Sequence, residues 1–255
     1  MKSWALVTGA TAGIGESFTR LLAANNYNII LVARDVPRLE ERAAALRANY
    51  AVETVILQAD LSTDAGCLTI ENYIAANEID VLINNAGFGI NKAFTASALN
   101  AEQDLLNVLV RTPMRLMHVV LLGMKVRNKG VIINVSSVAG FIAGGTYSAS
   151  KSYLTVLSES LHTELAGTRV LVSSLCPGFT RTEFHQRGRM SMKGLPAFMW
   201  LDADDLVAKS WQDALAGKAI SIPGWQYQLL SFFIRNLPRP IVRKMGMNLR
   251  RKQRR

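Results

Sequence analysis

Short runs rich in Val, Ile and Leu alternate with longer segments of helical periodicity along most of this 255-residue chain. Such alternation is typical of βαβ units, whose strands lie parallel in one sheet. Because the runs are almost continuously apolar, both faces of the sheet should be buried. We therefore predict an α/β fold in a single domain, with a doubly wound and mostly parallel sheet of seven strands flanked by helices. The expected strands are 4–8, 28–33, 52–58, 81–84, 130–136, 169–175 and 219–222, and the expected helices are 14–25, 38–49, 63–77, 101–125, 147–166 and 203–216.

The net charge of +10 comes almost entirely from the C-terminal end of the chain. Residues 235–255 hold nine of the 29 basic residues and none of the 19 acidic ones, which leaves 20 basic against 19 acidic residues and a net charge of +1 elsewhere. This basic run has no recognisable nucleic-acid-binding fold beside it. We therefore do not expect nucleic acid as a partner.

A dense apolar stretch precedes the basic run, so we divide the chain into a nucleotide-binding domain over 1–224 and an apolar, then basic, extension over 225–255. Two interpretations of the extension stay open. It contacts a membrane peripherally, because apolar burial and attraction to anionic lipid reinforce each other. Alternatively, its apolar residues cover a substrate pocket or a subunit interface, and the last six residues, 250–255, are disordered.

The remaining composition points to the cytoplasm. An apolar strand pattern begins at Trp4, which leaves no room for a signal peptide, and no stretch reaches the roughly 18 uninterrupted apolar residues of a membrane span. The two cysteines, Cys67 and Cys176, are far apart and are expected to be buried thiols. We expect no metal, because the histidines do not cluster at metal-ligand spacing (His118, His162 and His185).

A glycine-rich turn, Thr8-Gly9-Ala10-Thr11-Ala12-Gly13-Ile14-Gly15, follows the first expected strand. Glycine lets the backbone approach a pyrophosphate closely, and the charge of the pyrophosphate then lies at the positive N-terminus of the next helix. The spacing is G-x-x-x-G-x-G and differs from the G-x-G-x-x-G of the standard dinucleotide fingerprint, so a simple tight turn is the alternative. We expect cofactor contacts from Gly9, Thr11, Gly13, Ile14 and Gly15.

The end of the second strand predicts which cofactor binds. A free ribose 2′-hydroxyl calls for a carboxylate at this point, whereas a 2′-phosphate calls for a cation. Ala33 occupies the place of the carboxylate, and Arg34 follows with a planar fork suited to phosphate. We therefore expect NADP(H) rather than NAD, unless Asp35 turns inward. Asp60, with Leu61 after the third strand, is placed to contact adenine or, alternatively, to cap the next helix.

Tyr147 and Lys151 lie four residues apart, on one face of a predicted helix. Together with the glycine-rich turn, this pair makes the chain resemble the classical short-chain dehydrogenase/reductase family over about residues 3–222. The resemblance implies a Rossmann-type NADP-binding domain and a homodimer or homotetramer that pairs through its long helices. Six motifs occur in the family's order: Thr8 to Gly15, Asn84-Asn85-Ala86-Gly87, Asn107, Ser136-Ser137-Val138-Ala139-Gly140, Tyr147 to Lys151, and Pro177-Gly178 with Thr180 and Thr182.

By this resemblance Tyr147 donates a proton to the substrate carbonyl while the nicotinamide delivers hydride. A tyrosine with a pKa near about 10 is a poor acid–base group at neutral pH. We expect the Lys151 ammonium and the oxidised nicotinamide to lower that pKa. Lys151 would also hold the nicotinamide ribose, and Ser137 would hydrogen-bond the carbonyl oxygen. Asn107 matches the family position that anchors a water between the lysine and solvent.

The resemblance also implies the other cofactor contacts. Asn84, Ala86 and Gly87 would lie along the adenosine ribose, and Pro177, Gly178, Thr180 and Thr182 would lie near the nicotinamide. One departure concerns the serine: Ser137 precedes Tyr147 by only ten residues, so the loop 141–146 is shorter than is usual in the family, and Ser136 is the alternative catalytic serine.

Residues 180–201 have little periodicity and several apolar side chains, as a substrate lid would: Phe184, Met190, Met192, Leu195, Phe198, Met199 and Trp200. We therefore predict an NADP(H)-dependent oxidoreductase that interconverts a carbonyl and a secondary alcohol on an apolar small molecule. A catalytically idle nucleotide-binding protein, which senses redox state or tethers a partner to a membrane, is the alternative on the same fold.

Overall fold

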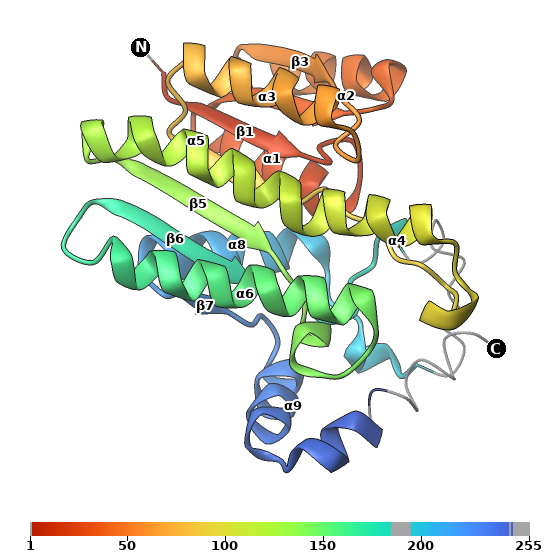
Figure 1. Ribbon diagram of the computed structural model, residues 1–255. Coiled ribbons are helices and arrows are strands. Elements are labelled where there is room, and N and C mark those ends of the chain that lie inside the picture. Colours follow the sequence, from red (N-terminus) through yellow and green to blue (C-terminus); the bar gives the residue numbers. More distant parts are fainter. Residues whose placement is uncertain (1, 185–194, 245, 247–255) are drawn as a thin grey trace.

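Residues 2–184, 195–244 and 246 are described by the computed structural model (Figure 1). One sheet contains seven parallel strands in the order β3-β2-β1-β4-β5-β6-β7, which confirms the predicted doubly wound fold. The strands are β1 (Trp4–Thr8), β2 (Asn28–Ala33), β3 (Thr54–Gln58), β4 (Val81–Asn84), β5 (Gly130–Val135), β6 (Val170–Leu175) and β7 (Ile220–Ser221). The helices are α1 (Gly13–Ala24), α2 (Val36–Tyr50), α3 (Asp64–Ala76), α4 (Leu99–Leu106), α5 (Thr112–Arg127), α6 (Thr146–Glu164), α8 (Ala203–Leu215) and α9 (Trp225–Asn236).

Helices cover both faces of the sheet and form two apolar layers. Side chains alternate between the faces along each strand. In β1, Leu6 belongs to the layer under α3, α5 and α6, whereas Ala5 and Val7 belong to the layer under α1, α2 and α8. Burying each Leu or Ile of these layers contributes roughly 1.5–3 kcal/mol. The two-sided burial explains why the strands are almost continuously apolar in the sequence.

The direction of winding reverses beside β1, which pairs with β2 on one side and β4 on the other. In open parallel sheets, the crevice at such a reversal lies at the carboxyl ends of the strands and accepts ligands. Thr8 ends β1 there, and its hydroxyl donates a hydrogen bond to the Ile83 carbonyl at 3.2 Å. The loops that follow β1 and β4 therefore begin side by side.

The segment predicted as one helix over 101–125 is instead interrupted. A π-helical turn over Asn107–Arg111 separates α4 from α5. Pro113 lies at the start of α5 and has no amide hydrogen to donate to the preceding turn, which accounts for the irregularity. Within the described residues, Leu99–Arg127 is long and apolar enough to cross a membrane by length and composition, yet half of its most apolar window is buried inside the protein.

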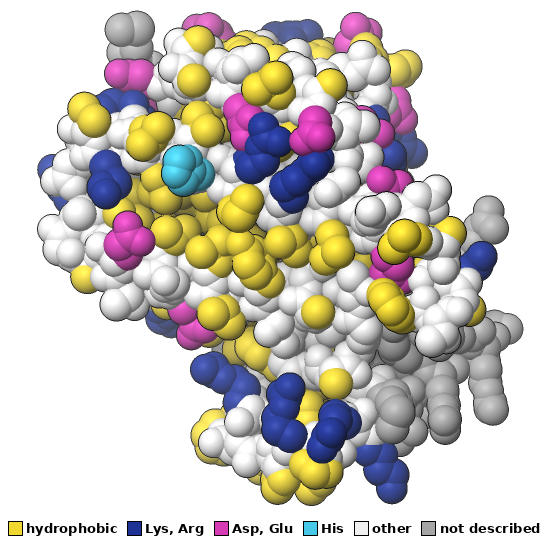
Figure 2. Space-filling view, viewed as in Figure 1, with side chains coloured by type: hydrophobic (Ala, Val, Ile, Leu, Met, Phe, Trp, Pro, Cys, Tyr) yellow, Lys and Arg dark blue, Asp and Glu magenta, His cyan; other side chains and the backbone are white. Residues whose placement is uncertain are grey.

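Two surfaces of the fold matter below. α5 and α6 lie next to each other and expose apolar side chains, among them Leu122, Val126 and Val156 (Figures 1 and 2). The extension predicted over 225–255 begins as α9, and residues 239–244 are also helical. The basic cluster 250–255 and the lid residues His185, Met190 and Met192 lie outside the described part of the chain.

Candidate active site

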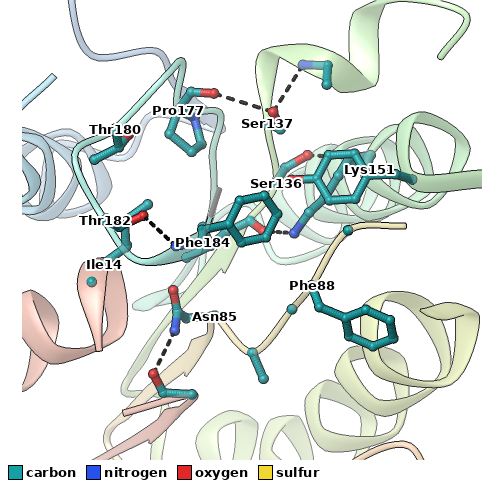
Figure 3. Close-up of a pocket in the computed structure, with 18 of the residues that line it drawn as sticks. Ile14, Asn85, Phe88, Ser136, Ser137, Lys151, Pro177, Thr180, Thr182 and Phe184 are labelled. Atoms are coloured by element: carbon teal, nitrogen blue, oxygen red, sulfur yellow. Dashed lines mark hydrogen bonds between the residues drawn. The ribbon is translucent and has the colours of Figure 1, made fainter. Parts of the chain in front are cut away.

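A cavity of about 1400 Å³ lies at the carboxyl ends of the strands. Loops that follow β1 to β6 line it, as do α6 and α9 (Figure 3). Pockets for one small ligand typically measure about 300–1000 Å³. This cavity therefore has room for a dinucleotide and a second molecule.

The glycine-rich turn forms one wall of the cavity. Gly9 and Gly13 have positive φ angles of +66° and +55°, which favour glycine. A Cβ on Gly15 would lie 2.2 Å from the Gly9 carbonyl oxygen, so this glycine permits close packing behind the cavity. No side chain caps α1 at its N-cap residue, Ala12, and the first residues of α1 line the cavity. Of the five predicted residues of the turn, Gly9, Thr11, Gly13 and Ile14 line the cavity, and Gly15 does not.

Asn85 joins the loop after β4 to the glycine-rich turn. Its Nδ2 donates hydrogen bonds to the carbonyls of Thr8 (2.8 Å) and Gly9 (3.2 Å), and its backbone N–H donates to the Thr8 hydroxyl at 2.9 Å. The predicted Asn84 is instead buried, and its Nδ2 donates to Asn134 Oδ1 at 2.8 Å across the β4–β5 pair. Asn85, Ala86 and Gly87 line the cavity, whereas Asn84 does not.

The end of β2 presents a cation to the cavity. The Arg34 side chain is 75% exposed, and its Nη1 lies 3.8 Å from Asp60 Oδ2. Asp35 caps α2, because its carboxylate accepts a hydrogen bond from the backbone N–H of Arg38 at 3.2 Å. That hydrogen bond engages the carboxylate that was the alternative ligand for a ribose hydroxyl. Arg38 Nη1 also lies 3.0 Å from Glu183 Oε2, which connects α2 to the start of the lid.

Asp60 and Leu61 line the cavity next to Arg34. Asp60 Oδ1 accepts hydrogen bonds from the backbone N–H (3.0 Å) and the hydroxyl (2.8 Å) of Ser62. Burial raises the pKa of Asp60, but these hydrogen bonds and the charge of Arg34 lower it further, so the net pKa falls below its ordinary value. The cap of α3 is Thr63, so the alternative interpretation of Asp60 as the helix cap is wrong.

Tyr147 and Lys151 project from the first turns of α6, as their spacing predicts. Lys151 is buried, its Nζ donates a hydrogen bond to the Val135 carbonyl at 2.6 Å, and it lies 5.7 Å from the centroid of the Tyr147 ring. Burial lowers the pKa of Lys151 to about 8. Burial also raises the pKa of Tyr147 to about 12, and the Ser137 side chain offsets this only in part.

The direction for Tyr147 is opposite to the one expected from the sequence. Tyr147 is half-buried and lines the cavity, and its partial removal from water disfavours the phenolate and raises the pKa. Lys151 is itself buried, which lowers its pKa and disfavours its charged form. The protein's own groups therefore hold Tyr147 as a protonated phenol at neutral pH.

Ser136 and Ser137 point in different directions. Ser137 Oγ accepts a hydrogen bond from the Ala139 N–H at 3.1 Å, donates to the Pro177 carbonyl at 3.4 Å, and interacts with the Tyr147 side chain (Figure 3). Ser136 is buried, and its Oγ donates to the Lys151 carbonyl at 2.7 Å. The hydroxyl next to the tyrosine thus belongs to Ser137.

Asn107 begins the π-helical turn and does not line the cavity. Its Nδ2 donates a hydrogen bond to the Ser62 carbonyl at 2.8 Å, which fastens the turn to the loop after β3. A Cβ on Gly87 would lie 2.9 Å from the side chain of Leu109, which belongs to the same turn. The turn therefore shapes the wall of the cavity near Lys151, and a role for Asn107 in proton transfer stays a prediction.

The loop after β6 connects the cavity to α9. A Cβ on Gly178 would lie 2.0 Å from the ring of Tyr227, so only glycine fits against this ring. Tyr227 Oη accepts a hydrogen bond from the Phe179 N–H at 2.9 Å and donates one to the Met199 carbonyl at 2.5 Å. Tyr227 is not among the residues predicted for the site. Its helical spacing with Leu230 and Ile234 is the signal that could have revealed it, because all three line the cavity.

Pro177, Gly178, Thr180 and Thr182 also line the cavity, as expected for contacts near a nicotinamide. Thr182 packs against the glycine-rich turn, because a Cβ on Gly13 would lie 2.9 Å from it. The lid thus starts directly above the turn that would hold a pyrophosphate.

Apolar side chains surround the part of the cavity next to Tyr147. The Phe184 ring lies 6.0 Å from the Tyr147 ring, and further apolar lining comes from Phe88, Ile90, Ile142, Leu195, Met199, Leu230 and Ile234. The short loop before Tyr147 packs under the extension: the Arg235 guanidinium lies 5.6 Å from the centroid of the Phe141 ring. The extension therefore covers the pocket, as one of the two interpretations of its apolar residues proposed.

Comparisons with known proteins agree with this geometry. A family profile described as short chain dehydrogenase matches residues 3–192. The human protein called inactive hydroxysteroid dehydrogenase-like protein 1 is 35% identical over 187 residues, which cover 70% of this chain and 56% of that protein. The very-long-chain 3-oxoacyl-CoA reductase of Rattus norvegicus is 33% identical over 187 residues, which cover 71% of this chain and 60% of the reductase. The matches thus span less than two thirds of the length of these relatives.

Among solved structures, a short-chain dehydrogenase from Sphingobium yanoikuyae in complex with NADPH has a TM-score of 0.83 at 28% identity. The match covers 92% of this chain and 96% of that one.

Proposed function

Because the chain belongs to the short-chain dehydrogenase family, we propose that it is an NADP(H)-dependent oxidoreductase that interconverts a carbonyl group and a secondary alcohol on an apolar substrate. The observation that carries the proposal is the placement of Tyr147, Ser137 and Lys151 in the same cavity as the glycine-rich turn. A proton donor and a nucleotide cradle thus share one space, as transfer of a hydride and a proton to one substrate requires.

The lining of the cavity fits a dinucleotide. The positive φ angles of Gly9 and Gly13 let the backbone approach a pyrophosphate, and the uncapped N-terminus of α1 favours negative charge. NADPH bound there would supply a hydride to the carbonyl carbon. The exposed guanidinium of Arg34 lines the cavity and would bind a 2′-phosphate, whereas Asp35 is engaged in capping α2. These two residues support NADP(H) over NAD.

Tyr147 is the proposed proton donor. Burial raises its pKa to about 12, which makes it a weaker acid but leaves its hydroxyl protonated at neutral pH. Its proton can still pass to the oxygen of a carbonyl under reduction, because that oxygen becomes alkoxide-like and more basic than a phenolate. Ser137 Oγ is next to Tyr147 and would donate a hydrogen bond to the same oxygen as negative charge develops on it. Lys151, with a pKa of about 8, exchanges protons near neutral pH and would return one to Tyr147.

The substrate is proposed to be an apolar carbonyl compound. Phe88, Phe184 and Ile142 line the cavity near Tyr147. The residues that α9 contributes to the cavity, Tyr227, Leu230 and Ile234, are all uncharged. The names of the two relatives, a hydroxysteroid dehydrogenase-like protein and a very-long-chain 3-oxoacyl-CoA reductase, support a hydrophobic substrate.

One relative is described as inactive, which favours a second candidate: a nucleotide-binding protein without catalytic activity. The presence of Tyr147, Lys151 and Ser137 together favours the enzyme. We further propose a homodimer or homotetramer, because Leu122 and Val126 of α5 and Val156 of α6 are exposed, and hydrophobic side chains gather on the face of Figure 2 where Figure 1 places these helices.

The test is Tyr147→Phe in an assay that follows NADPH oxidation with a panel of apolar ketones. We expect turnover to fall by at least about 100-fold, because the general acid is lost, while NADPH binding measured by fluorescence titration stays within error. Tyr153→Phe, on the exposed side of the same helix, is the matched control and should keep full activity. Undiminished turnover in the Tyr147 variant refutes the mechanism. A wild-type protein that binds NADPH but reduces no ketone favours the inactive alternative.

A further inference from the structure

Helix α9 has two apolar faces. Consecutive residues in a helix are about 100° apart around its axis. One face of α9 packs inward, where Tyr227, Leu230 and Ile234 line the cavity. The opposite face consists of Trp225, Leu229, Phe232 and Phe233, which we call the outer face of α9, and these side chains are between 51% and 70% exposed. A helix that is apolar on both sides is expected to be covered on both sides.

The surroundings of the outer face are basic. After Asp213, the chain has no acidic residue, and nine basic residues lie between 235 and 255. Within the described residues, Arg239, Arg243 and Lys244 are exposed on the helical turn that follows α9. We call these three residues the basic flank. At the lower end of the molecule in Figure 2, where Figure 1 places α9, hydrophobic side chains lie beside Lys and Arg.

We propose that the outer face of α9 and the basic flank dock on the surface of an anionic lipid bilayer. The aromatic and leucine side chains would enter the boundary between headgroups and acyl chains, and the basic flank would contact the lipid phosphates. Either attraction alone is weak, but the two come from neighbouring segments of the chain, α9 and the helical turn that directly follows it.

Two other occupants fit the same surface less well. A second copy of the chain would bring two basic segments together, and their like charges would repel across the contact. A nucleic acid would match the charge, but its polar backbone would leave the large exposed side chains of Leu229, Phe232 and Phe233 without an apolar partner. Of these three occupants, the lipid surface supplies both the negative charge and the apolar environment.

Docking would also orient the active site, a consequence that rests on the proposed function. Tyr227 fastens the inner face of α9 to Phe179 and Met199 through its hydroxyl. The helix that would lie on the bilayer is thus one wall of the cavity, about one helix diameter from the lipid. An apolar carbonyl compound dissolved in the membrane would reach Tyr147 past α9 with little exposure to water.

The experiment is a flotation assay of the full chain with vesicles of phosphatidylcholine alone and of a phosphatidylcholine–phosphatidylserine mixture. The test variant combines Phe232→Ser with Arg239→Glu. The matched control combines Leu215→Ser with Arg169→Glu, because Leu215 is 52% exposed and Arg169 is also exposed, at positions away from α9. Equal thermal midpoints and equal NADPH affinity show that all variants are folded.

We expect wild type and control to float with the anionic vesicles and much less with the neutral ones, and high salt should weaken this binding. The test variant should bind at least about tenfold more weakly, since each basic residue near an anionic surface contributes about fivefold and an apolar contact is lost as well. Absence of wild-type binding, or equal loss in the control variant, overturns the proposal. So does a change in oligomeric state of the test variant without vesicles, which would identify a second copy as the occupant.

Turnover separates this proposal from the proposed function. NADPH oxidation is followed with a water-soluble ketone and with a ketone dissolved in the vesicles. If the protein floats but reduces neither ketone, the docking stands and the enzymatic proposal falls. If it reduces both ketones without floating, the enzyme stands and the docking falls. If docking delivers substrate, the test variant should lose rate only with the vesicle-borne ketone.

Discussion

Replacing Lys151 with methionine should stabilise the folded protein at neutral pH while it abolishes turnover. Lys151 is buried, and burial lowers its pKa from 10.5 to about 8. The gap between these values corresponds to about 3 kcal/mol of destabilisation wherever the lysine is charged in both the folded and the unfolded chain. Methionine has a similar length without the charge, so Lys151→Met removes this cost with little change in packing.

One loss offsets part of the gain. The Nζ of Lys151 donates a hydrogen bond to the Val135 carbonyl at 2.6 Å, and methionine cannot replace it. A hydrogen bond of this kind contributes about 1 kcal/mol. We therefore expect Lys151→Met to raise the free energy of unfolding by about 2 kcal/mol at pH 7.

The pH dependence has a definite sign. The folded chain loses the lysine proton as the pH rises through about 8, whereas the unfolded chain keeps it until about 10.5. The cost of burying the charge is therefore full below pH 8, declines between pH 8 and 10.5, and vanishes above. At pH 10 less than about 1 kcal/mol of it remains, so the variant and wild type should be almost equally stable.

Urea denaturation followed by tryptophan fluorescence at pH 7 and pH 10 measures both values. Lys125→Met removes an exposed lysine from α5 and serves as the control, with an expected change within about 0.5 kcal/mol at both pH values. A Lys151 variant that is less stable than wild type at pH 7, or a stability difference that does not change with pH, would refute the reasoning. Either result would mean that burial of the Lys151 ammonium does not lower the free energy of unfolding.

Three further predictions concern single side chains. Arg34→Ala should weaken NADPH binding by about tenfold to a hundredfold and NADH binding much less, because only NADPH has the 2′-phosphate. Isothermal titration calorimetry with both cofactors measures the two affinities, and equal weakening contradicts the assigned role. Ser137→Ala should lower kcat by about 10²–10³-fold. Ser136→Ala should instead lower the free energy of unfolding by about 1 kcal/mol and leave kcat nearly unchanged. The reverse pattern would make Ser136 the catalytic serine. Tyr227→Phe removes the hydroxyl that joins Phe179, in the loop after β6, to Met199 in the lid. The KM for an apolar ketone should therefore rise while NADPH affinity holds, and an unchanged KM would exclude this positioning role.

The motifs of the site were largely predictable because their signals are local. The glycine-rich turn, Asn85-Ala86-Gly87 and the Tyr147–Lys151 pair each depend on spacing within one turn or one helix, and the structure brings them into one cavity. The choice between Asn84 and Asn85 was not predictable in this way. Asn84 faces Asn134 in the paired strands, which turns it away from the cavity, and that pairing joins residues 50 positions apart in the chain.

The extension illustrates the same limit. Its composition indicated both an apolar and a basic character, and two interpretations followed from that composition. The fold places Tyr227 against Gly178 and Arg235 against Phe141, so the inner face of α9 lines the cavity and contacts the short loop before Tyr147. The outer face remains exposed, and its partner is the subject of the bilayer experiment.

By itself, the sequence determined the seven-stranded doubly wound sheet and placed Tyr147 and Lys151 one turn apart on α6, because hydrophobic periodicity and helical spacing are properties of neighbouring residues. Only the tertiary structure decided the pKa values of that pair. The pKa values of Tyr147 and Lys151 move in the directions set by burial, and their partners Ser137 and Val135 come from β5 and the residues after it. No local pattern records how many distant atoms come to surround an ionisable group, and its pKa depends on that burial.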